Sequence, residues 1–439
     1  MSKTVKCAIL GFGGRGRGYA NYLQNEDTEF VAIIDPNPYV LQTAKEMLGL
    51  SDDKLFLTLD DFLAKKPACD FIYNATMDQL HYETSIKILN AGYNMLLEKP
   101  ITPNVDELLE IERLAEEKNC IVLVCHCLRY TPFYRKIKEI IDSGEIGKVM
   151  NLQLNEHVWH GHFVNAFVRG KWRSEAECGS GLLLAKSCHD TDLICWLNNK
   201  TRPTEVASFG NRSFYTPENA PEGSTEYCYD CPKKEECIFD AYKFHLKLDC
   251  CPRYTYPTSV FPKPLEEVTE EEKREYLKTS VFGKCVYKTD MDIVDKQSVI
   301  INFADGSTAS LNVVGGVTKA GRHIHVICEY GEILGYTEEG KIIYRKFNKD
   351  AVNEKYKGDP YMYTDTEIEP MQETVESTME IGHYGGDFFL VKDLLKLLRG
   401  EGTSVSLTKL EDSVNSHLVV YAAEKSRLEK KIVSVAEFR

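Results

Sequence analysis

A glycine-rich loop near the start of the chain constrains the fold more than any other feature. Residues 11–16 read Gly-Phe-Gly-Gly-Arg-Gly, which fits the pattern G-x-G-x-x-G, and they follow a short apolar run at 5–10. A helical pattern at 18–24 and a second apolar run at 30–34 come next. A loop of this kind between a strand and a helix is typical of dinucleotide binding, because the helix N-terminus attracts the diphosphate.

The loop and the strand after it also indicate which dinucleotide binds. The loop residues expected to contact it are Gly11, Gly13, Gly14, Arg15 and Gly16. Glycines there allow a tight turn, a close approach of the pyrophosphate and contact between helix and strand, while Arg15 either adds charge near the diphosphate or lies on the surface. Asp35 follows the second strand, where a carboxylate binds the adenosine ribose and repels a 2′-phosphate. We therefore expect NAD rather than NADP.

Strand and helix patterns alternate through the first 127 residues. Further strand-like runs lie at 71–74, 94–97 and 121–125, and helical patterns lie at 39–48, 81–90 and 105–117. Alternation of this kind implies right-handed crossovers and a parallel sheet. The pattern predicts an α/β architecture with a Rossmann dinucleotide-binding domain over residues 1–127.

The rest of the chain is dominated by strand patterns. They lie at 151–158, 204–209, 298–303, 308–314 and 323–329, and Asp305-Gly306 is a strong hairpin signal between two of them. Helical patterns return at 388–398 and 407–425, and the charged stretch 265–275 reads as an exposed helix or loop. We predict an α+β domain over residues 128–439, built on a mostly antiparallel sheet and interrupted by a Cys-rich insertion at about 211–285.

Composition narrows the range of functions. The net charge of −14 argues against nucleic acid as the main partner, and no run of about 18 apolar residues is present to span a membrane. The N-terminus has no signal-peptide layout, so the 15 cysteines are interpreted as reduced thiols of a cytoplasmic protein.

A second set of polar residues follows two strands of the predicted parallel sheet. Glu98-Lys99-Pro100 comes directly after the run at 94–97, and Thr76 to His81 follow the run at 71–74. Ligands bind at the carboxyl ends of such strands. We expect Lys99 to contact both the nicotinamide ribose and a substrate hydroxyl, and Glu98, Thr76 and His81 to line the cofactor, with plain strand-end residues as the alternative.

These motifs resemble the glucose–fructose oxidoreductase / inositol dehydrogenase / rhizopine-catabolism (Gfo/Idh/MocA) family. Arg129-Tyr130-Thr131-Pro132 is similar to the family's opening of the second domain, and the run from Gly181 to Asp192 is similar to its catalytic helix. The resemblance extends over the whole chain. It implies a Rossmann domain followed by a domain with a large open sheet, and an NAD-dependent dehydrogenase acting on a sugar, sugar derivative or cyclitol.

The resemblance also implies the catalytic residues. Lys99 and His189 match the lysine and the helix histidine that contact the reacting hydroxyl, with histidine as acid–base and lysine stabilising the alkoxide. Related members carry an aspartate four residues before this histidine, where this chain has Ala185. Lys186 and Asp192, at i−3 and i+3 from His189, are expected on the same helix face and could replace that aspartate.

Other polar residues of the second half are candidates for substrate contact. They are Arg129, His162, Trp172 and Arg173. If residues 157–162 form a strand, His160 and His162 share one face and could bind substrate, bind zinc or lie on the surface. Asp290-Met-Asp292 and the run from His383 to Asp387 are either turns or loops suited to hydroxyl-rich ligands.

Cysteines gather in the insertion. Cys228, Cys231 and Cys237, followed by Cys250 and Cys251, have a spacing that could form a tetrahedral zinc site. The predicted ligand set is Cys228, Cys231, Cys237 and Cys251, and such a site would be structural. Free thiols remain an open alternative, as do a disulfide or an iron–sulfur cluster.

Two further functions remain open alongside the dehydrogenase. The first is an NAD-dependent glycosidase, in lineages similar to this family, which oxidises a sugar hydroxyl transiently so that the aglycone can be eliminated. The second is a non-catalytic NAD-sensing regulator, which would not need Lys99 and His189 together. An open sheet face would favour self-association into a homodimer or homotetramer.

Overall fold

The computed structural model describes residues 3–249, 252–348, 363–370 and 382–439. Its N-terminal part holds a six-stranded parallel sheet in the order β3-β2-β1-β4-β5-β6. The strands are β1 (Val5–Leu10), β2 (Thr28–Ile34), β3 (Leu55–Phe56), β4 (Phe71–Asn74), β5 (Asn94–Leu97) and β6 (Val122–Val124). The order reverses between β1 and β4, and ligands bind at this switch point in parallel sheets. The predicted Rossmann fold is therefore confirmed.

Five helices connect these strands. They are α1 (Gly14–Leu23), α2 (Pro38–Leu48), α3 (Leu59–Lys65), α4 (His81–Asn90) and α5 (Val105–Glu117). α1 begins at Gly14, inside the glycine loop, and not at residue 18 as its apolar spacing suggested. The backbone amides of its first turn therefore lie within the loop itself, where an anion would be bound.

The second sheet has nine strands in the described residues, in the order β14-β13-β12-β11-β7-β10-β9-β8-β15. Only the pair β7 and β10 is parallel, so the predicted mostly antiparallel sheet is confirmed. The strands are β7 (Val149–Trp159), β8 (Pro203–Asn211), β9 (Lys296–Phe303), β10 (Thr308–Val317), β11 (Gly321–Cys328), β12 (Gly331–Tyr336), β13 (Lys341–Phe347), β14 (Tyr363–Ile368) and β15 (Val433–Ser434). Asp305-Gly306 lies in the hairpin between β9 and β10.

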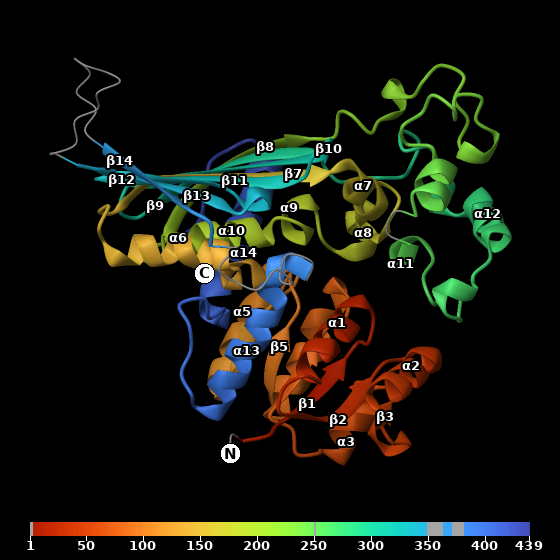
Figure 1. The fold of residues 1–439 in the computed structure, drawn as a ribbon, viewed down its shortest axis with the longest axis horizontal. Coiled ribbons are helices and arrows are strands. Elements are labelled where there is room, and N and C mark those ends of the chain that lie inside the picture. Colours follow the sequence, from red (N-terminus) through yellow and green to blue (C-terminus); the bar gives the residue numbers. More distant parts are fainter. Residues whose placement is uncertain (1–2, 250–251, 349–362, 371–381) are drawn as a thin grey trace.

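Helices cover one face of this sheet, between it and the N-terminal part, and no helix of the described residues covers the other face (Figure 1). The covering helices are α6 (Pro132–Ser143), α9 (Leu182–Ala185), α10 (Cys188–Leu197) and α14 (Leu410–Glu429). Phe209 and Ile300 remain largely exposed on neighbouring strands β8 and β9. None of the helices in the described ranges is long and apolar enough to cross a bilayer.

Helix α13 (Gly386–Arg399) returns to the N-terminal sheet after the second sheet is complete. Its apolar residues, Leu390 and Leu394 among them, share a core with Ile9 and Phe71 of the parallel sheet. The predicted division at residue 127 assigned this helix to the second domain. The tertiary packing places it against the first sheet, because that sheet's exposed apolar face needs a cover.

The insertion between β8 and β9 lies at one end of the second sheet, beside α7 (His160–Phe163) and α8 (Glu175–Cys178) (Figure 1). It contains α11 (Pro252–Thr255) and α12 (Glu270–Thr279). The charged stretch 265–275 was expected to be an exposed helix or loop, and α12 forms its second half. Its start is fixed by a capping box, in which Thr269 and Glu272 satisfy each other's backbone amides.

Candidate active site

The glycine loop has the geometry of a dinucleotide cradle. Gly11 has φ +88°, and a Cβ there would lie 2.6 Å from the Ala75 carbonyl oxygen. A Cβ on Gly16 would collide with the Gly11 carbonyl, so α1 and β1 pack too closely for any other residue. A Cβ on Gly13 would meet no atom within 4 Å. Gly13 therefore faces open space at the helix N-terminus, where a pyrophosphate fits.

Asp35 is held against this loop at the end of β2. It is only 9% exposed, and its two carboxylate oxygens each accept a backbone N–H, from Phe12 at 2.9 Å and from Asn37 at 2.9 Å. A carboxylate can accept about four hydrogen bonds, so lone pairs remain for ribose hydroxyls. The residues fit the adenosine half of NAD.

His81 contacts both of the segments that follow strands β4 and β5. Its imidazole is buried, with Nδ1 at 2.7 Å from the Pro100 carbonyl and Nε2 at 3.1 Å from the Thr76 carbonyl. Both ring nitrogens therefore face the backbone. His81 positions Thr76 and the segment after Lys99, which differs from the predicted direct contact with the cofactor.

Arg15 connects the start of α1 to two buried carboxylates. Its Nε lies 2.7 Å from Glu98, and its two terminal nitrogens lie 3.0 and 2.9 Å from Asp387. Burial alone would raise the pKa of Asp387, but Arg15 and His383 outweigh it and hold this pKa well below its usual range. The charge of Arg15 is thus compensated within the protein, and its expected role beside the diphosphate is not evident from its contacts.

Lys99 reaches from the parallel sheet to the second half of the chain. Its Nζ donates a hydrogen bond to the Ala185 carbonyl at 2.9 Å. Burial disfavours the charged amine, but Cys188 and then the carboxylates of Asp78 and Glu98 outweigh this cost, and the pKa of Lys99 lies above its usual value. Lys99 is therefore a fixed cation between the end of strand β5 and the end of helix α9.

His189 lies in the first turn of α10, buried beside other histidines. Its ring centroid is 5.5 Å from that of His383 and 5.6 Å from that of His126. Neither of its nitrogens has a hydrogen-bond partner among the described residues. Burial, then the charge of Lys99, hold its pKa well below the usual value, so the ring is neutral and can accept a proton.

His383 and Asp387 supply an acid–histidine pair that we did not assign to catalysis from the sequence. The Nδ1 of His383 lies 2.8 Å from Asp387, and His383 has φ +52°, a left-handed conformation that costs energy for a non-glycine residue. Potential ligand atoms of Cys127, His189 and His383 lie within 4.8 Å of one another. The sequence signal was the His-Tyr-Gly-Gly-Asp run at 383–387, which we could not distinguish from a turn.

Comparison with known proteins agrees with this geometry. Residues 5–126 match the family model described as an oxidoreductase family with an NAD-binding Rossmann fold, and residues 134–229 match the GFO/IDH/MocA C-terminal domain. The chain belongs to the Gfo/Idh/MocA family. It is therefore an oxidoreductase with an NAD-binding Rossmann domain.

Two curated relatives and two solved structures illustrate the similarity of this Gfo/Idh/MocA chain. YteT of Bacillus subtilis is 26% identical over 74% of this chain and 72% of its own length. Inositol 2-dehydrogenase of Corynebacterium glutamicum is 26% identical over a match that covers 45% of this chain and 55% of that relative. An Agrobacterium radiobacter oxidoreductase in complex with NAD+ has a TM-score of 0.68 at 12% identity, with all of both chains covered. Bordetella pertussis WlbA, in complex with NADH and UDP-GlcNAcA, has a TM-score of 0.66 at 16% identity over 98% of each chain.

A break in the expected single helix separates Lys186 from His189, because α9 ends at Ala185 and α10 begins at Cys188. Lys186 lies in this break and pairs with Glu156 at 3.1 Å. Asp192 lies with His189 on α10, where it is buried and forms a two-pronged ion pair with Arg129, with both distances 2.6 Å. The charged groups of Lys186 and Asp192 are therefore paired with residues other than His189.

The predicted substrate-binding residues have different environments. Arg129 is only 1% exposed, and its guanidinium forms an ion pair with Asp192 inside the protein. Arg173 pairs with Asp290 and Glu177 at the surface. Trp172 donates to Asp78 at 3.1 Å and so joins the second half of the chain to the loop after β4.

His160 and His162 do not share a strand. β7 ends at Trp159, and both histidines lie in the short helix α7. The predicted strand at 151–158 matches β7, and the condition for a shared strand face of the two histidines is not met because the backbone turns into α7 directly after Trp159. His162 is half-buried, and burial, followed by the charge of Lys186, lowers its pKa to about 3. It stays neutral near the Lys186–Glu156 pair.

Proposed function

We propose that this chain is an NAD-dependent dehydrogenase that acts on a hydroxyl-bearing carbon of a sugar, sugar derivative or cyclitol. The observation that carries the proposal is the meeting of Lys99, from the end of β5, with the segment that carries His189. The names of two relatives, inositol 2-dehydrogenase and D-xylose dehydrogenase, support this substrate class. The complex of WlbA with UDP-GlcNAcA supports a sugar derivative.

The site residues divide the chemistry among them. When bound, NAD would accept the hydride from the carbinol carbon, with the glycine loop and Asp35 holding its adenosine half. His189, neutral and without a protein partner in the described ranges, accepts the hydroxyl proton. Lys99 stabilises the developing alkoxide with its fixed charge. His383, oriented by Asp387, is placed to pass the proton on.

The reaction is tested with a panel of sugars, sugar acids and cyclitols. We expect absorbance from released NADH in step with substrate consumption. The NAD-dependent glycosidase would instead release free sugar from aryl glycosides with no net NADH, because its cofactor is recycled within each turnover. A regulator would bind NAD with neither product. The same panel with a Lys99→Ala variant identifies any contaminating activity.

NAD should bind more tightly than NADP, because Asp35 would lie against the 2′-phosphate. Dissociation constants for both cofactors, measured by calorimetry at one salt concentration, test this preference. Asp35→Ser should narrow the difference by about tenfold, the loss of one repulsive contact, while the surface variant Asp60→Ser should leave it unchanged. Equal affinities in the unmodified protein would contradict the role of Asp35.

We also infer that copies of the chain associate through the uncovered face of the nine-stranded sheet, as a homodimer or homotetramer. The exposed Phe209 and Ile300 on adjacent strands support this inference. Light scattering of the unmodified chain and of a Phe209→Ser variant measures the mass in solution; a monomer at micromolar concentration would contradict it.

A further inference from the structure

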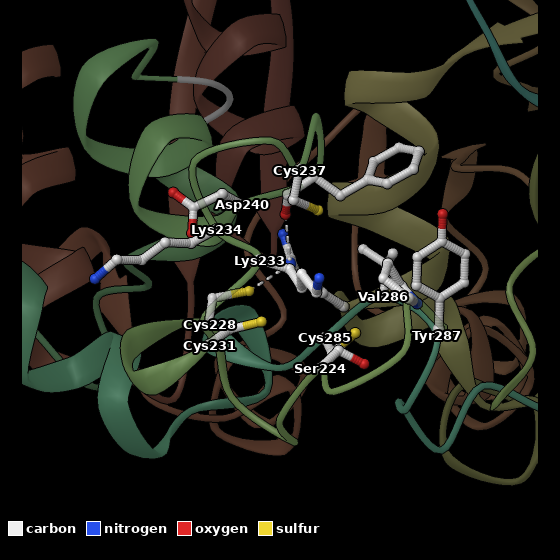
Figure 2. Close-up of a pocket in the computed structure, with 13 residues that line it drawn as sticks. Ser224, Cys228, Cys231, Lys233, Lys234, Cys237, Asp240, Cys285, Val286 and Tyr287 are labelled. Atoms are coloured by element: carbon white, nitrogen blue, oxygen red, sulfur yellow. Dashed lines mark hydrogen bonds between the residues drawn. The ribbon is translucent and has the colours of Figure 1, made fainter. Parts of the chain in front are cut away.

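Four cysteines of the insertion and its flank surround one small cavity (Figure 2). Cys228 and Cys231 bracket a short 3-10 turn, Cys237 follows in the next loop, and Cys285 comes from the segment leading to β9. The zinc set predicted from spacing had Cys251 as its fourth member, and that residue lies outside the described residues. The structure brings Cys285 to the place that the fourth ligand would take.

The cavity suits one ion. Its volume is about 20 Å³, room for roughly one water-sized particle. The cavity therefore has room for an ion between the four sulfurs.

Backbone amides face each of the four sulfurs. The amides of Lys233, Phe239 and Tyr287 lie beside the sulfurs of the cysteines two residues before them, Cys231, Cys237 and Cys285, and the amide of Ala241 lies beside the sulfur of Cys228. The same turn geometry recurs at three separate cysteines, as expected if each turn presents its sulfur to a common centre.

Arg169 supplies a buried positive charge beside the sulfurs. Its guanidinium is fully buried, with one terminal nitrogen 3.5 Å from the Cys228 sulfur and 2.8 Å from the Phe239 carbonyl. Its other terminal nitrogen, Nη1, has no hydrogen-bond partner among the described residues. Four thiolates around Zn²⁺ carry a net charge of about −2. A buried cation with a spare N–H would offset part of that charge.

We propose that Cys228, Cys231, Cys237 and Cys285 bind one structural zinc ion, with Arg169 donating to the sulfurs from outside the ligand set. No three of these sulfurs lie within 4.8 Å of one another in the described structure. Binding must therefore draw them toward the usual Zn–S distance of about 2.3 Å. Four thiolates leave no open position, so the ion would hold the loops of Cys228 to Cys237 against the segment of Cys285 that leads to β9, and it would take no part in the hydride transfer.

Elemental analysis of the full-length chain, purified without chelators, tests the site directly. We expect about one zinc per chain, falling toward zero in Cys285→Ser. Cys120→Ser, at a half-buried cysteine of the Rossmann domain, and Cys251→Ser should both retain it. Zinc retained in Cys285→Ser but lost in Cys251→Ser would overturn the assignment of the fourth ligand.

If Cys285→Ser does not fold, measurements on the unmodified chain test the zinc site instead. Exchange of the bound ion for Co²⁺ should give the visible and near-ultraviolet absorption of tetrahedral cobalt with four sulfur ligands. A mercurial reagent should release the metal as four thiols react. Three outcomes would overturn the proposal. The first is a chain that contains no metal and whose four thiols all react in the native state. The others are a disulfide between two of the four cysteines, and iron found together with inorganic sulfide. These readouts do not depend on enzymatic turnover, so they stand apart from the dehydrogenase assay.

Discussion

Replacing His189 with alanine should lower turnover about 10²-fold or more, the usual scale for loss of an acid–base group. Its ring is neutral, buried and without a partner among the described residues, so its nitrogens are available to accept the hydroxyl proton. Lys99→Ala should cause a comparable loss, because it removes the cation that stabilises the alkoxide. Steady-state kinetics on a verified substrate measure both effects.

Cofactor binding and pH separate the two roles. NAD affinity should survive His189→Ala but weaken in Lys99→Ala, which can also contact the nicotinamide ribose. Since the pKa of His189 lies well below its ordinary value of about 6.5, acidification should protonate the base and reduce kcat only below that pH. Lys186→Ala is the comparison variant, because Lys186 pairs with Glu156 and not with His189. Near-native turnover in His189→Ala would refute the catalytic assignment.

Gly13→Ala should weaken NAD binding by about tenfold or more without unfolding the protein, as expected for one lost close contact. The added methyl group meets no protein atom within 4 Å, so it fits the fold but fills the space where the pyrophosphate approaches. Gly16→Ala should act differently: its methyl group would collide with the Gly11 carbonyl, and the expected result is loss of the folded Rossmann domain. Calorimetric NAD binding and thermal melting distinguish the two.

Gly18→Ala is the matched control for this pair. Its methyl group also meets no atom within 4 Å, but Gly18 lies further along α1, away from the diphosphate. Alanine is the better helix former by about 1 kcal/mol, so this variant should melt at an equal or higher temperature and bind NAD normally. A Gly13→Ala protein that binds NAD as tightly as Gly18→Ala would show that the cofactor does not approach the loop there.

The parallel sheet was predictable because its evidence is local. Strands β1, β4, β5 and β6 are buried over most of their length and read as short apolar runs, and the longer crossover helices have their own period. Strand β3, which is only two residues long, and helix α3 after it were not predicted. The second sheet was harder to predict. β12 and β13 were missed because their burial is only partial over much of their length, so their alternation in sequence is weak. α1 was started too late, since its first turn is glycine-rich and carries no apolar periodicity.

The sequence by itself determined the Rossmann fold and the family, and it predicted the cofactor loop with Asp35 and the pair Lys99 and His189, because each depends on residue types at fixed spacing along the chain. Only the tertiary structure decided which residues surround them. It bound Asp192 to Arg129 and Lys186 to Glu156, and it brought His383 beside His189 and Cys285 beside Cys228. Those neighbours come from segments separated by tens to hundreds of residues. Their meeting depends on how helices and sheets pack, which no local spacing encodes.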